Sequence, residues 1–569
     1  MAAPPWPVSG PSRWSAPACS NEPVRGRVGD HAPHSVNTTT AGLPACRRHC
    51  GSLGAMQPDY LIIGSGLAGL SFGALMARAG KRVRLLEAHS LPGGYGHTFE
   101  MGERYRFNAQ LHYVWNCGEG QTVHRLLSKL GLADEVTFEQ YDRNGFDHMR
   151  MPGYALDIPY DLDELAARLG RLFPRHAGPL ARFVEEVRRT AEEIDALPEP
   201  LSTLALLPRL HRFTRVLRYR KATLQQVFDR FGLPLEAQTL LALQWPDFLL
   251  PPGQLSFFAW VMLFVGYTRG AYYPTRHFEH VIDSLVGVIE KHGGEVLTGH
   301  KVIEFVLDGD RVRGVVAEQV DDSGVPTGPV AEHSGTEVVC NMDPRRAAEM
   351  IGLGHFSRSV RRKLDYDYSP SNFVAYCVVE GIDLRDHGFG RWNLFHAEHP
   401  DLNQAFHDML LRGDYSRPSF AVTTPGLLTD VKGDCREGQQ IIQFLTVADH
   451  ARFRDLKLAD PRAYRDKKRE IFDAILDVME RDYVPGLRRH MVFKMTGSPT
   501  TNQRYCHSPA GHSYGSNMTP QNIGPGRLDH RSSLAHFHFC SASAGYAGFA
   551  GACWTGCRLY EHLSGDRLR

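Results

Sequence analysis

The sequence has no long hydrophobic run, no paired cysteine motif and almost no net charge. Its most apolar stretch, LSFFAWVMLFVGY at 255–267, is shorter than the about 20 residues that a membrane-spanning helix needs. The formal charge of +1 gives no reason to expect nucleic acid as a partner. The eleven cysteines include no CxxC pair, which is typical of reduced thiols in the cytoplasm. We therefore expect a cytoplasmic globular protein that is either free in solution or bound to one face of a membrane.

Signals for metal or phosphoryl-transfer chemistry are also missing. No HExxH motif or Cys/His spacing is found, although His277 and His280 could share one face of a helix. No phosphate loop of the GxxxxGK[ST] type and no internal repeat is present. The sequence therefore predicts no metal site.

Residues 1–55 differ in composition from the rest. They are rich in Pro, Ser, Ala, Gly and Arg and show no hydrophobic periodicity or apolar signal region. We expect either a disordered arm or an extension upstream of a true start at Met56.

The strongest motif follows directly, in DYLIIGSGLAGLSFGALMARAG. It predicts a buried strand at 60–63, a glycine turn and a helix from about 67 to 79. Gly64, Gly66 and Gly69 have GxGxxG spacing, and Glu87 ends the next strand about 20 residues on. This spacing is typical of a dinucleotide site, in which the helix N-terminus faces the pyrophosphate and the acid holds a ribose. A purely structural glycine turn is the less favoured interpretation.

A second glycine cluster follows Glu87 at once, in EAHSLPGGYGHTF. A carboxylate followed by bare backbone at Gly93 and Gly94 predicts two parts of one cofactor, a ribose and then a pyrophosphate with a flat ring. An NAD dehydrogenase does not usually carry such a loop here, which favours FAD.

Several segments together resemble the flavoprotein group of phytoene desaturases, carotenoid isomerases and retinol saturases, and more remotely the amine oxidases. The similar segments are PGGYGHTF, RFNAQLHYVW at 106–115, the stretch 280–317, VVCNMDP at 338–344 and the C-terminal 537–563. The resemblance implies an α/β, glutathione-reductase-like (Rossmann-type) FAD-binding domain in three pieces, 57–155, 270–350 and 495–569. It also implies a second, mixed α+β substrate domain at 155–270 and 350–495.

The sequence departs from this group at three places. Thr275, Arg276 and His277 replace a Gly-Gly pair, Asn108 stands where Asp is common, and SASAGYAG replaces an acidic or amide turn. Ser541 or Ser543 would then serve the flavin's ribityl chain, or backbone N–H groups alone. The larger polar residues at 275–277 indicate an altered site beside the ring.

The C-terminal segment supports the same cofactor without any family. A half-buried strand, HFHFC, precedes three glycines and an apolar helix whose N-terminus can face the flavin ring. The alternative is that this helix only packs against the core and that the glycines loosen its packing. The resulting cofactor-binding candidates are Gly64, Ser65, Gly66, Leu67, Ala68, Gly69, Glu87, Gly93, Gly94, His97, Thr98, Val302, Ser543, Gly548, Phe549 and Ala550.

The catalytic candidates are two polar pairs. His112 with Tyr113 is predicted from motif position, and Arg276 with His277 from the departure at 275–277. Histidine suits a proton donor near neutral pH, and arginine suits only charge stabilisation. The alternative is that His112 satisfies a buried backbone group and that Arg276 pairs with a surface acid.

A basic stretch, ALLPRLHRFTRVLRYRKAT at 205–223, has apolar residues between its Arg and Lys residues, and no acid occurs from 201 to 227. It suits either peripheral contact with an anionic membrane or the solvated face of a helix. The apolar stretch 255–267 suits a core helix or the wall of an apolar tunnel. The sequence indicates nothing about the oligomeric state.

Two classes of function remain open. The first is an enzyme that saturates, desaturates or isomerises C–C double bonds of an apolar polyene, with an amine-oxidase-type flavoenzyme as the runner-up. The second is a non-catalytic prenyl- or lipid-binding escort protein of the same fold. The intact GxGxxG, Glu87 and Gly-Gly loop favour the enzyme.

Overall fold

A five-stranded parallel sheet carries the glycine motif and joins strands that lie far apart in the chain. The computed structural model describes residues 57–102, 105–198, 207–429, 431 and 433–568. The strand order is β10 (Glu295–Leu297), β2 (Val83–Leu86), β1 (Tyr60–Ile63), β14 (Glu337–Cys340) and β20 (Phe537–Phe539). Every residue of the central strand β1 is buried, as expected for a parallel sheet covered on both faces. The predicted strand at 60–63 and the α/β fold class are confirmed.

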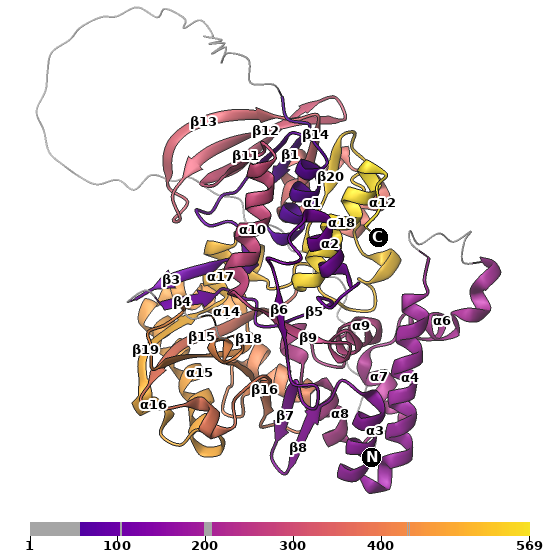
Figure 1. The fold of residues 1–569 in the computed structure, drawn as a ribbon, viewed down its shortest axis with the longest axis vertical. Helices are drawn as coiled ribbons and strands as arrows, with labels where there is room; N and C mark the ends of the chain where they lie inside the picture. Colours follow the sequence, from indigo (N-terminus) through magenta and orange to yellow (C-terminus); the bar gives the residue numbers. More distant parts are fainter. Residues whose placement is uncertain (1–56, 103–104, 199–206, 430, 432, 569) are drawn as a thin grey trace, which may run out of the picture. The chain divides into compact units, whose positions relative to one another are not determined.

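Helices from both ends of the chain pack together on this sheet. The indigo helix α1 (Leu67–Arg78) contacts the yellow helix α18 (Gly548–Ser564) and also α10 (His277–Lys291) (Figure 1). A Cβ on Gly556 would lie 2.4 Å from the Ala68 carbonyl oxygen, so the glycine allows α1 and α18 to approach closely. Helix α2 (Thr122–Leu130) packs against the same pair.

An antiparallel sheet of β11 (His300–Asp308), β12 (Arg311–Val320) and β13 (Pro326–Ser334) precedes the returning strand β14. After β14 come α11 (Pro344–Ile351) and α12 (Arg358–Leu364). The predicted order of helix, glycine turn and strand pair over 280–317 is therefore present.

The second large sheet is mixed. Its order is β19 (Met491–Gly497), β15 (Ser371–Glu380), β18 (Gln439–Ala448), β17 (Ser419–Thr423), β16 (Asn393–Ala397), β7 (Asp147–Met151) and β8 (Tyr154–Ile158). Only the β16–β7 pair is parallel. The predicted domain limits stay a prediction, but the hairpin β7–β8 shows that this sheet begins before residue 155.

Helices α13 (Leu402–Phe406), α14 (His450–Ala459), α15 (Pro461–Asp482), α16 (Leu487–His490) and α17 (Pro499–Tyr505) alternate with these strands or follow them. Phe472 of α15 contacts Phe444 of β18, with ring centroids 6.1 Å apart. The helix therefore packs on the sheet through its apolar stripe.

A helical segment lies between β8 and β9. It contains α3 (Leu162–Leu172), α4 (Ala177–Asp195), α6 (Thr214–Tyr219), α7 (Leu224–Phe231), α8 (Leu235–Ala242) and α9 (Phe257–Thr268). Trp260 of α9 is buried against Phe264, with ring centroids 4.6 Å apart, and against Phe183 and Phe228. The apolar stretch is therefore a core helix. Over the described residues, every helix is too short or too polar to cross a membrane.

Two small sheets complete the fold. One pairs β3 (Thr98–Met101) with β4 (Tyr105–Asn108), and the other has the order β5 (Val114–Trp115), β9 (Ala271–Pro274), β6 (Phe138–Gln140). The expectations for residues 1–55 fall outside the described residues.

Candidate functional site

The loop after β1 and the first turn of α1 leave no room for a side chain at Gly66 and Gly69. A Cβ on Gly66 would lie 2.8 Å from Asn341 Nδ2, and one on Gly69 would lie 2.7 Å from the Gly64 carbonyl oxygen. Gly64 has a φ of +96°, which favours glycine. Helix α1 starts directly after Gly66 without a side-chain cap, so its first N–H groups are available to an anion.

Asn341, at the end of β14, fixes this loop. Its side-chain amide donates to the carbonyl oxygens of Gly64 at 3.0 Å and Gly66 at 3.2 Å. The motif at 338–344 predicted only a returning strand and did not indicate a role for Asn341. An amide placed directly after a buried strand was the available signal.

Glu87 connects the two glycine loops through Ser65. Its Oε2 accepts hydrogen bonds from the Ser65 backbone N–H at 2.7 Å and from Ser65 Oγ at 2.6 Å. Ser65 Oγ in turn accepts from the Gly93 N–H at 3.1 Å, and the other carboxylate oxygen, Oε1, accepts from the His89 N–H at 2.9 Å. The three predicted cofactor residues Ser65, Glu87 and Gly93 therefore form one hydrogen-bonded group.

These contacts limit what Glu87 can still bind. A carboxylate has about four lone-pair sites, and three of those on Glu87 are taken by protein donors. The remaining site is on Oε1, so the half-buried carboxylate has room for one ribose hydroxyl rather than two.

The Glu87→Ala variant is expected to weaken FAD binding by about 10- to 150-fold. One charge-assisted hydrogen bond is worth about 1.5–3 kcal/mol, and isothermal titration of the flavin-free protein with FAD measures the loss.

Glu295→Ala is the matched control, because Glu295 is an exposed acid on the neighbouring strand and pairs with Arg84 at 2.5 Å. Equal affinities for FAD in Glu87→Ala and the parent would contradict the prediction that Glu87 binds a ribose hydroxyl.

The second glycine loop lies directly on the first. Gly93 and Gly94 have φ values of +111° and +56°, and a Cβ on Gly94 would lie 3.2 Å from the Gly66 Cα. The buried His97 contacts the Gly94 carbonyl oxygen through Nδ1 at 2.6 Å, and burial lowers its pKa. Thr98 Oγ1 donates to Asn108 Oδ1 at 3.3 Å. His97 and Thr98 thus hold this loop, and contact with a cofactor stays a prediction.

Val302 and the C-terminal residues have different surroundings. Val302 is buried in β11 opposite Ala317. Phe549 is buried against Phe278, with ring centroids 5.8 Å apart, so its side chain anchors α18 and only its backbone is available to a cofactor. Ala550 is likewise buried.

The two candidate serines differ in the same way. Ser543 Oγ accepts from the Ser516 N–H at 2.9 Å, whereas the buried Ser541 Oγ has no hydrogen-bond partner among the described residues. Gly548 has a φ of +74° at the start of α18, and the helix has no side-chain cap. Of the two serines, Ser541 is therefore the one with an unused donor and acceptor.

A buried arginine, which the sequence analysis missed, organises the loop before α18. Arg527 is 4% exposed, and no carboxylate in the described part of the chain forms an ion pair with it. Its guanidinium instead donates to the carbonyl oxygens of Ser516, Asn517, Asn522, Ala542 and Gly545. Burial lowers its pKa to about 10, so it stays charged at neutral pH. An uncompensated positive charge thus lies beside the open N-terminus of α18, where it favours an anionic ligand.

Arg527→Met is expected to lower the free energy of unfolding by about 3–5 kcal/mol, because several buried carbonyl groups lose their donor. Urea unfolding of the flavin-free protein measures this.

Arg531→Met is the control, since Arg531 is an exposed residue that pairs with Asp529 at 2.9 Å and should contribute less than about 1 kcal/mol. A loss below about 1 kcal/mol in Arg527→Met would contradict the organising role.

His112 and Tyr113 lie in different surroundings although they are adjacent. Both ring nitrogens of His112 are buried and form no hydrogen bond of normal geometry with a described residue, while Gln443 lies near. Burial lowers the pKa of His112 to about 4. The imidazole is therefore neutral at neutral pH, which argues against the predicted role as proton donor. The Tyr113 hydroxyl oxygen lies 2.7 Å from Asp247 Oδ2, and its ring stacks on Tyr267 with ring centroids 4.2 Å apart.

The two residues of the second predicted pair, Arg276 and His277, have different partners. His277 has a φ of +63°, and its Nδ1 contacts the Tyr273 hydroxyl at 2.9 Å. Tyr273 also accepts from Asn108 Nδ2 at 2.8 Å. Arg276 is exposed, and its guanidinium contacts His280 at 3.5 Å. Across the described ranges no hydrogen bond, ion pair or ring contact joins Arg276 to His112 or Tyr113, so the predicted convergence of Arg276 with them has no contact to support it.

One cluster within the described ranges has metal-ligand geometry, formed by His396, Glu398 and Asp482. Arg481 already occupies it, because its guanidinium donates to Glu398 at 2.6 Å and to Asp482 at 2.5 Å. The cluster is a salt-bridge network, in which the pKa of Glu398 is lowered to about 2 by hydrogen bonding to His396 and Arg481.

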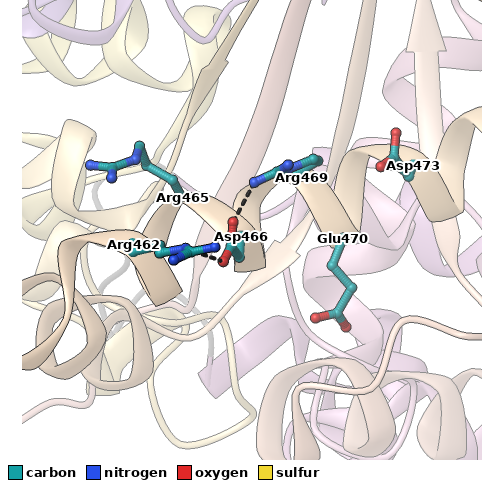
Figure 2. A pocket seen from close by; sticks show the side chains of 6 residues that line it. All are labelled: Arg462, Arg465, Asp466, Arg469, Glu470 and Asp473. Carbon is teal, nitrogen blue, oxygen red and sulfur yellow. Dashed lines mark hydrogen bonds and ion pairs between the residues drawn. The ribbon is translucent and has the colours of Figure 1, made fainter.

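Two surface hollows do not match an apolar ligand. The first, on α15, is lined only by charged side chains, and Arg462 and Arg469 both pair with Asp466 in it (Figure 2). The second lies between α4 and α9 beside Trp115, is partly apolar and has a volume of about 180 Å³. That is below the about 300 Å³ of a typical small-molecule site.

Comparison with known proteins agrees with this geometry. Residues 62–130 match the family described as an NAD(P)-binding Rossmann-like domain. The chain is 30% identical to a rat (Rattus norvegicus) all-trans-retinol 13,14-reductase over 44% of this chain and 42% of that protein. It is 21% identical to a zebrafish (Danio rerio) protein of the same name over 80% and 77%. It is also 22% identical to a Flavobacterium 1-hydroxycarotenoid 3,4-desaturase over 50% and 56%. The predicted resemblance to the retinol saturase and carotenoid desaturase group is confirmed.

The fold is also shared with an amine oxidase. A putrescine oxidase double mutant superposes with a TM-score of 0.60 at 14% identity, covering 90% of this chain and 99% of that one. At this identity the likeness shows the fold alone. In the match to the rat reductase, the chain spans less than half of the relative's length.

Proposed function

We propose that the protein is a FAD-dependent oxidoreductase that acts on C–C double bonds of a long apolar polyene of the carotenoid or retinoid kind. The observation that carries this proposal is the hydrogen-bonded group of Ser65, Glu87 and Gly93. It joins the GxGxxG loop to the Gly-Gly loop, so that one ligand can contact both.

The residues present fit FAD. Bare backbone at Gly66 and Gly94 allows a pyrophosphate to approach, and the free oxygen site of Glu87 suits a ribose hydroxyl. The unpartnered Ser541 Oγ lies on the loop that leads to the N-terminus of α18, and the guanidinium of Arg527 donates to the same loop at Ala542. These features suit the polar chain and the anionic edge of a flavin.

Bound FAD would supply hydride chemistry that no side chain of the protein offers. The chain's own residues would bind, orient and shield the substrate. Phe257, Trp260 and Phe264 stack along α9, and Tyr267 of the same helix stacks on Tyr113. The retinoid and carotenoid substrates in the relatives' names support a polyene as the substrate class.

The two alternatives are less favoured. An amine-oxidase activity has support only from the shared fold, which does not specify chemistry. An escort role without chemistry does not require an acid linked to both glycine loops, yet Glu87 is linked in this way.

The purified protein is expected to be yellow with non-covalent FAD, which heat or acid releases and chromatography identifies. Dithionite-reduced holo-protein incubated without oxygen with all-trans-retinol or lycopene should yield products altered at a double bond.

Gly66→Val is the negative control, because its side chain would collide with Asn341 and block the pyrophosphate. Release of FMN, or no flavin in either protein, would overturn the cofactor proposal. Flavin retention with no altered polyene would overturn the substrate class.

We further propose that part of the basic stretch contacts an anionic membrane surface. Leu210 and Leu217 are 37% and 41% exposed, and Arg212, Arg220 and Lys221 beside them are exposed as well. Apolar side chains among basic ones suit the lipid interface.

The structure changes which basic residues are available. Although no acid lies in the stretch itself, α4 supplies two. Arg215 pairs with Glu186 at 3.0 Å and with Glu193 at 3.1 Å, and Arg218 approaches Glu186 at 3.8 Å. Arg215 thus holds α6 to α4 and is not free for lipid.

Replacing Arg212, Arg220 and Lys221 together by Glu is expected to weaken sedimentation with phosphatidylserine vesicles by at least about 100-fold at low salt. Each basic residue near such a surface contributes about 1 kcal/mol, and flavin content should not change.

Replacing Arg358, Arg361 and Arg362 of α12 by Glu is the matched control, because these residues are equally exposed on another helix. Equal sedimentation of the parent and the first variant would leave 205–223 as a solvated surface.

A further inference from the structure

Two buried carboxylates share a single tyrosine hydroxyl. Tyr113 Oη lies 2.7 Å from Asp247 Oδ2 and 3.1 Å from Asp147 Oδ2. Gln244 Nε2 donates to Asp147 Oδ2 at 2.5 Å, and Asn393 Nδ2 donates to Asp147 Oδ1 at 3.2 Å. No sequence motif indicated this cluster, because its members come from β7, β16, the turn at Trp245–Asp247 and the segment before β5.

Counting protons shows that the cluster holds an acid. The tyrosine hydroxyl has one proton and can donate to only one carboxylate at a time. Asp147 already accepts hydrogen bonds from Gln244 and Asn393, so it is the ionised member, and the tyrosine donates to it. The shorter contact is then favourable only if Asp247 carries a proton and donates it to the tyrosine oxygen. Two adjacent carboxylates without a cation cannot both ionise cheaply. The cluster therefore holds one proton more than two free aspartates would at neutral pH.

The groups around the pair confirm this charge balance. Asp247 faces Tyr113, Asp147, Tyr267 and Tyr514, and none of these is a cation. Asp147 additionally faces Tyr141, Tyr160, Gln244 and Asn393. Burial raises the pKa of Asp147 to about 7 and that of Asp247 to about 8.

The pair is connected to the cofactor loops by the segment 512–516. Tyr95 of the Gly-Gly loop donates to the His512 carbonyl oxygen, and the Ser516 N–H donates to Ser543 Oγ at 2.9 Å. Between them, Tyr514 donates to the carbonyl oxygen of Pro246, next to Asp247, at 3.1 Å. Asp147 is fully buried, whereas Asp247 keeps some accessible surface. Asp247 is thus the member of the pair that can meet a ligand.

We propose that Asp247 is the catalytic acid of this protein and that Tyr113 is the residue that positions it. Saturating one double bond adds a hydride to one carbon and a proton to the other. Bound reduced flavin would supply the hydride, and the Asp247 carboxyl group would supply the proton, which water would then replace. The inference rests on the proposed function. It names a proton source in place of His112, which is neutral at pH 7 because its pKa is about 4.

The first test needs no turnover. Infrared difference spectra of the purified full chain between pH 6 and pH 10 should show a carbonyl band of a protonated carboxylic acid that disappears as the pH rises. Asp247→Asn should remove the part of the band that disappears as the pH rises through about 8, and Asp229→Asn, at an exposed acid on α7, should keep it. A band that is absent from the parent, or equal in parent and Asp247→Asn, overturns the proposal.

The second test measures the proton transfer itself. With dithionite-reduced holo-protein and all-trans-retinol, Asp247→Asn should lose about 10²–10⁴-fold in rate while keeping its flavin. The parent rate should be constant at low pH and fall as the pH rises through about 8, because the acid is lost.

Tyr113→Phe is a second variant that tests the proposal even if Asp247→Asn does not fold. Once Asp247 has lost its proton, the tyrosine hydroxyl can donate to the carboxylate, which lowers the pKa of Asp247. Removal of the hydroxyl should therefore move the fall in rate to higher pH without changing flavin content. An unchanged pH profile in Tyr113→Phe, or full rate in Asp247→Asn, overturns the assignment. If the parent saturates neither retinol nor lycopene, the proposed function fails, and with it the role of Asp247 toward a polyene. The infrared band then still decides whether the acid exists.

Discussion

The close approach of three strand ends around bare backbone is the constraint on which the site depends. β1, β2 and β14 end at the same edge of the parallel sheet, and Asn341 ties the loop after β1 to β14 through two carbonyl oxygens. That contact leaves no space for a Cβ at Gly66 or Gly69. The glycines are therefore required twice, once by the protein's own packing and once by the ligand that we propose.

The charges of the site are arranged with opposite signs in two places. The open N-termini of α1 and α18 and the unpaired Arg527 make the cofactor loops electropositive. Asp147 and Asp247 have no cation nearby and share one proton, so the pair carries one negative charge rather than two. The first region favours the anionic dinucleotide that we propose, and the shared proton lowers the charge that an apolar ligand would meet in the second. The segment 512–516 joins the two regions through the hydroxyl group of Tyr514.

The cofactor half of this arrangement could be predicted from the sequence because its signals are local. GxGxxG, the strand-ending Glu87 and the Gly93-Gly94 pair each depend on backbone geometry within a few residues. The confirmed strand β1 and the joining of Glu87 to Ser65 and Gly93 follow from that. The limit of one ribose hydroxyl on Glu87 could not be predicted, since it depends on donors that only the folded loop brings together.

The remainder depends on contacts between distant segments. Asp147 and Asp247 are 100 positions apart in the chain and meet at Tyr113 only because β7 and the turn at Trp245–Asp247 lie against the same tyrosine. Arg527 looks like any loop arginine in the sequence, and Arg215 looks free for lipid until α4 supplies its acids. His112 was chosen from its motif position, which gives no information on burial, and burial decides its charge.

A crystal structure of the protein with bound FAD tests the central claim most directly. The account predicts the pyrophosphate against the N–H groups at the start of α1, one ribose hydroxyl on Glu87 Oε1, and the flavin ring beside the N-terminus of α18. An adenosine half bound away from Glu87, or a flavin remote from the segment 512–516, would contradict it.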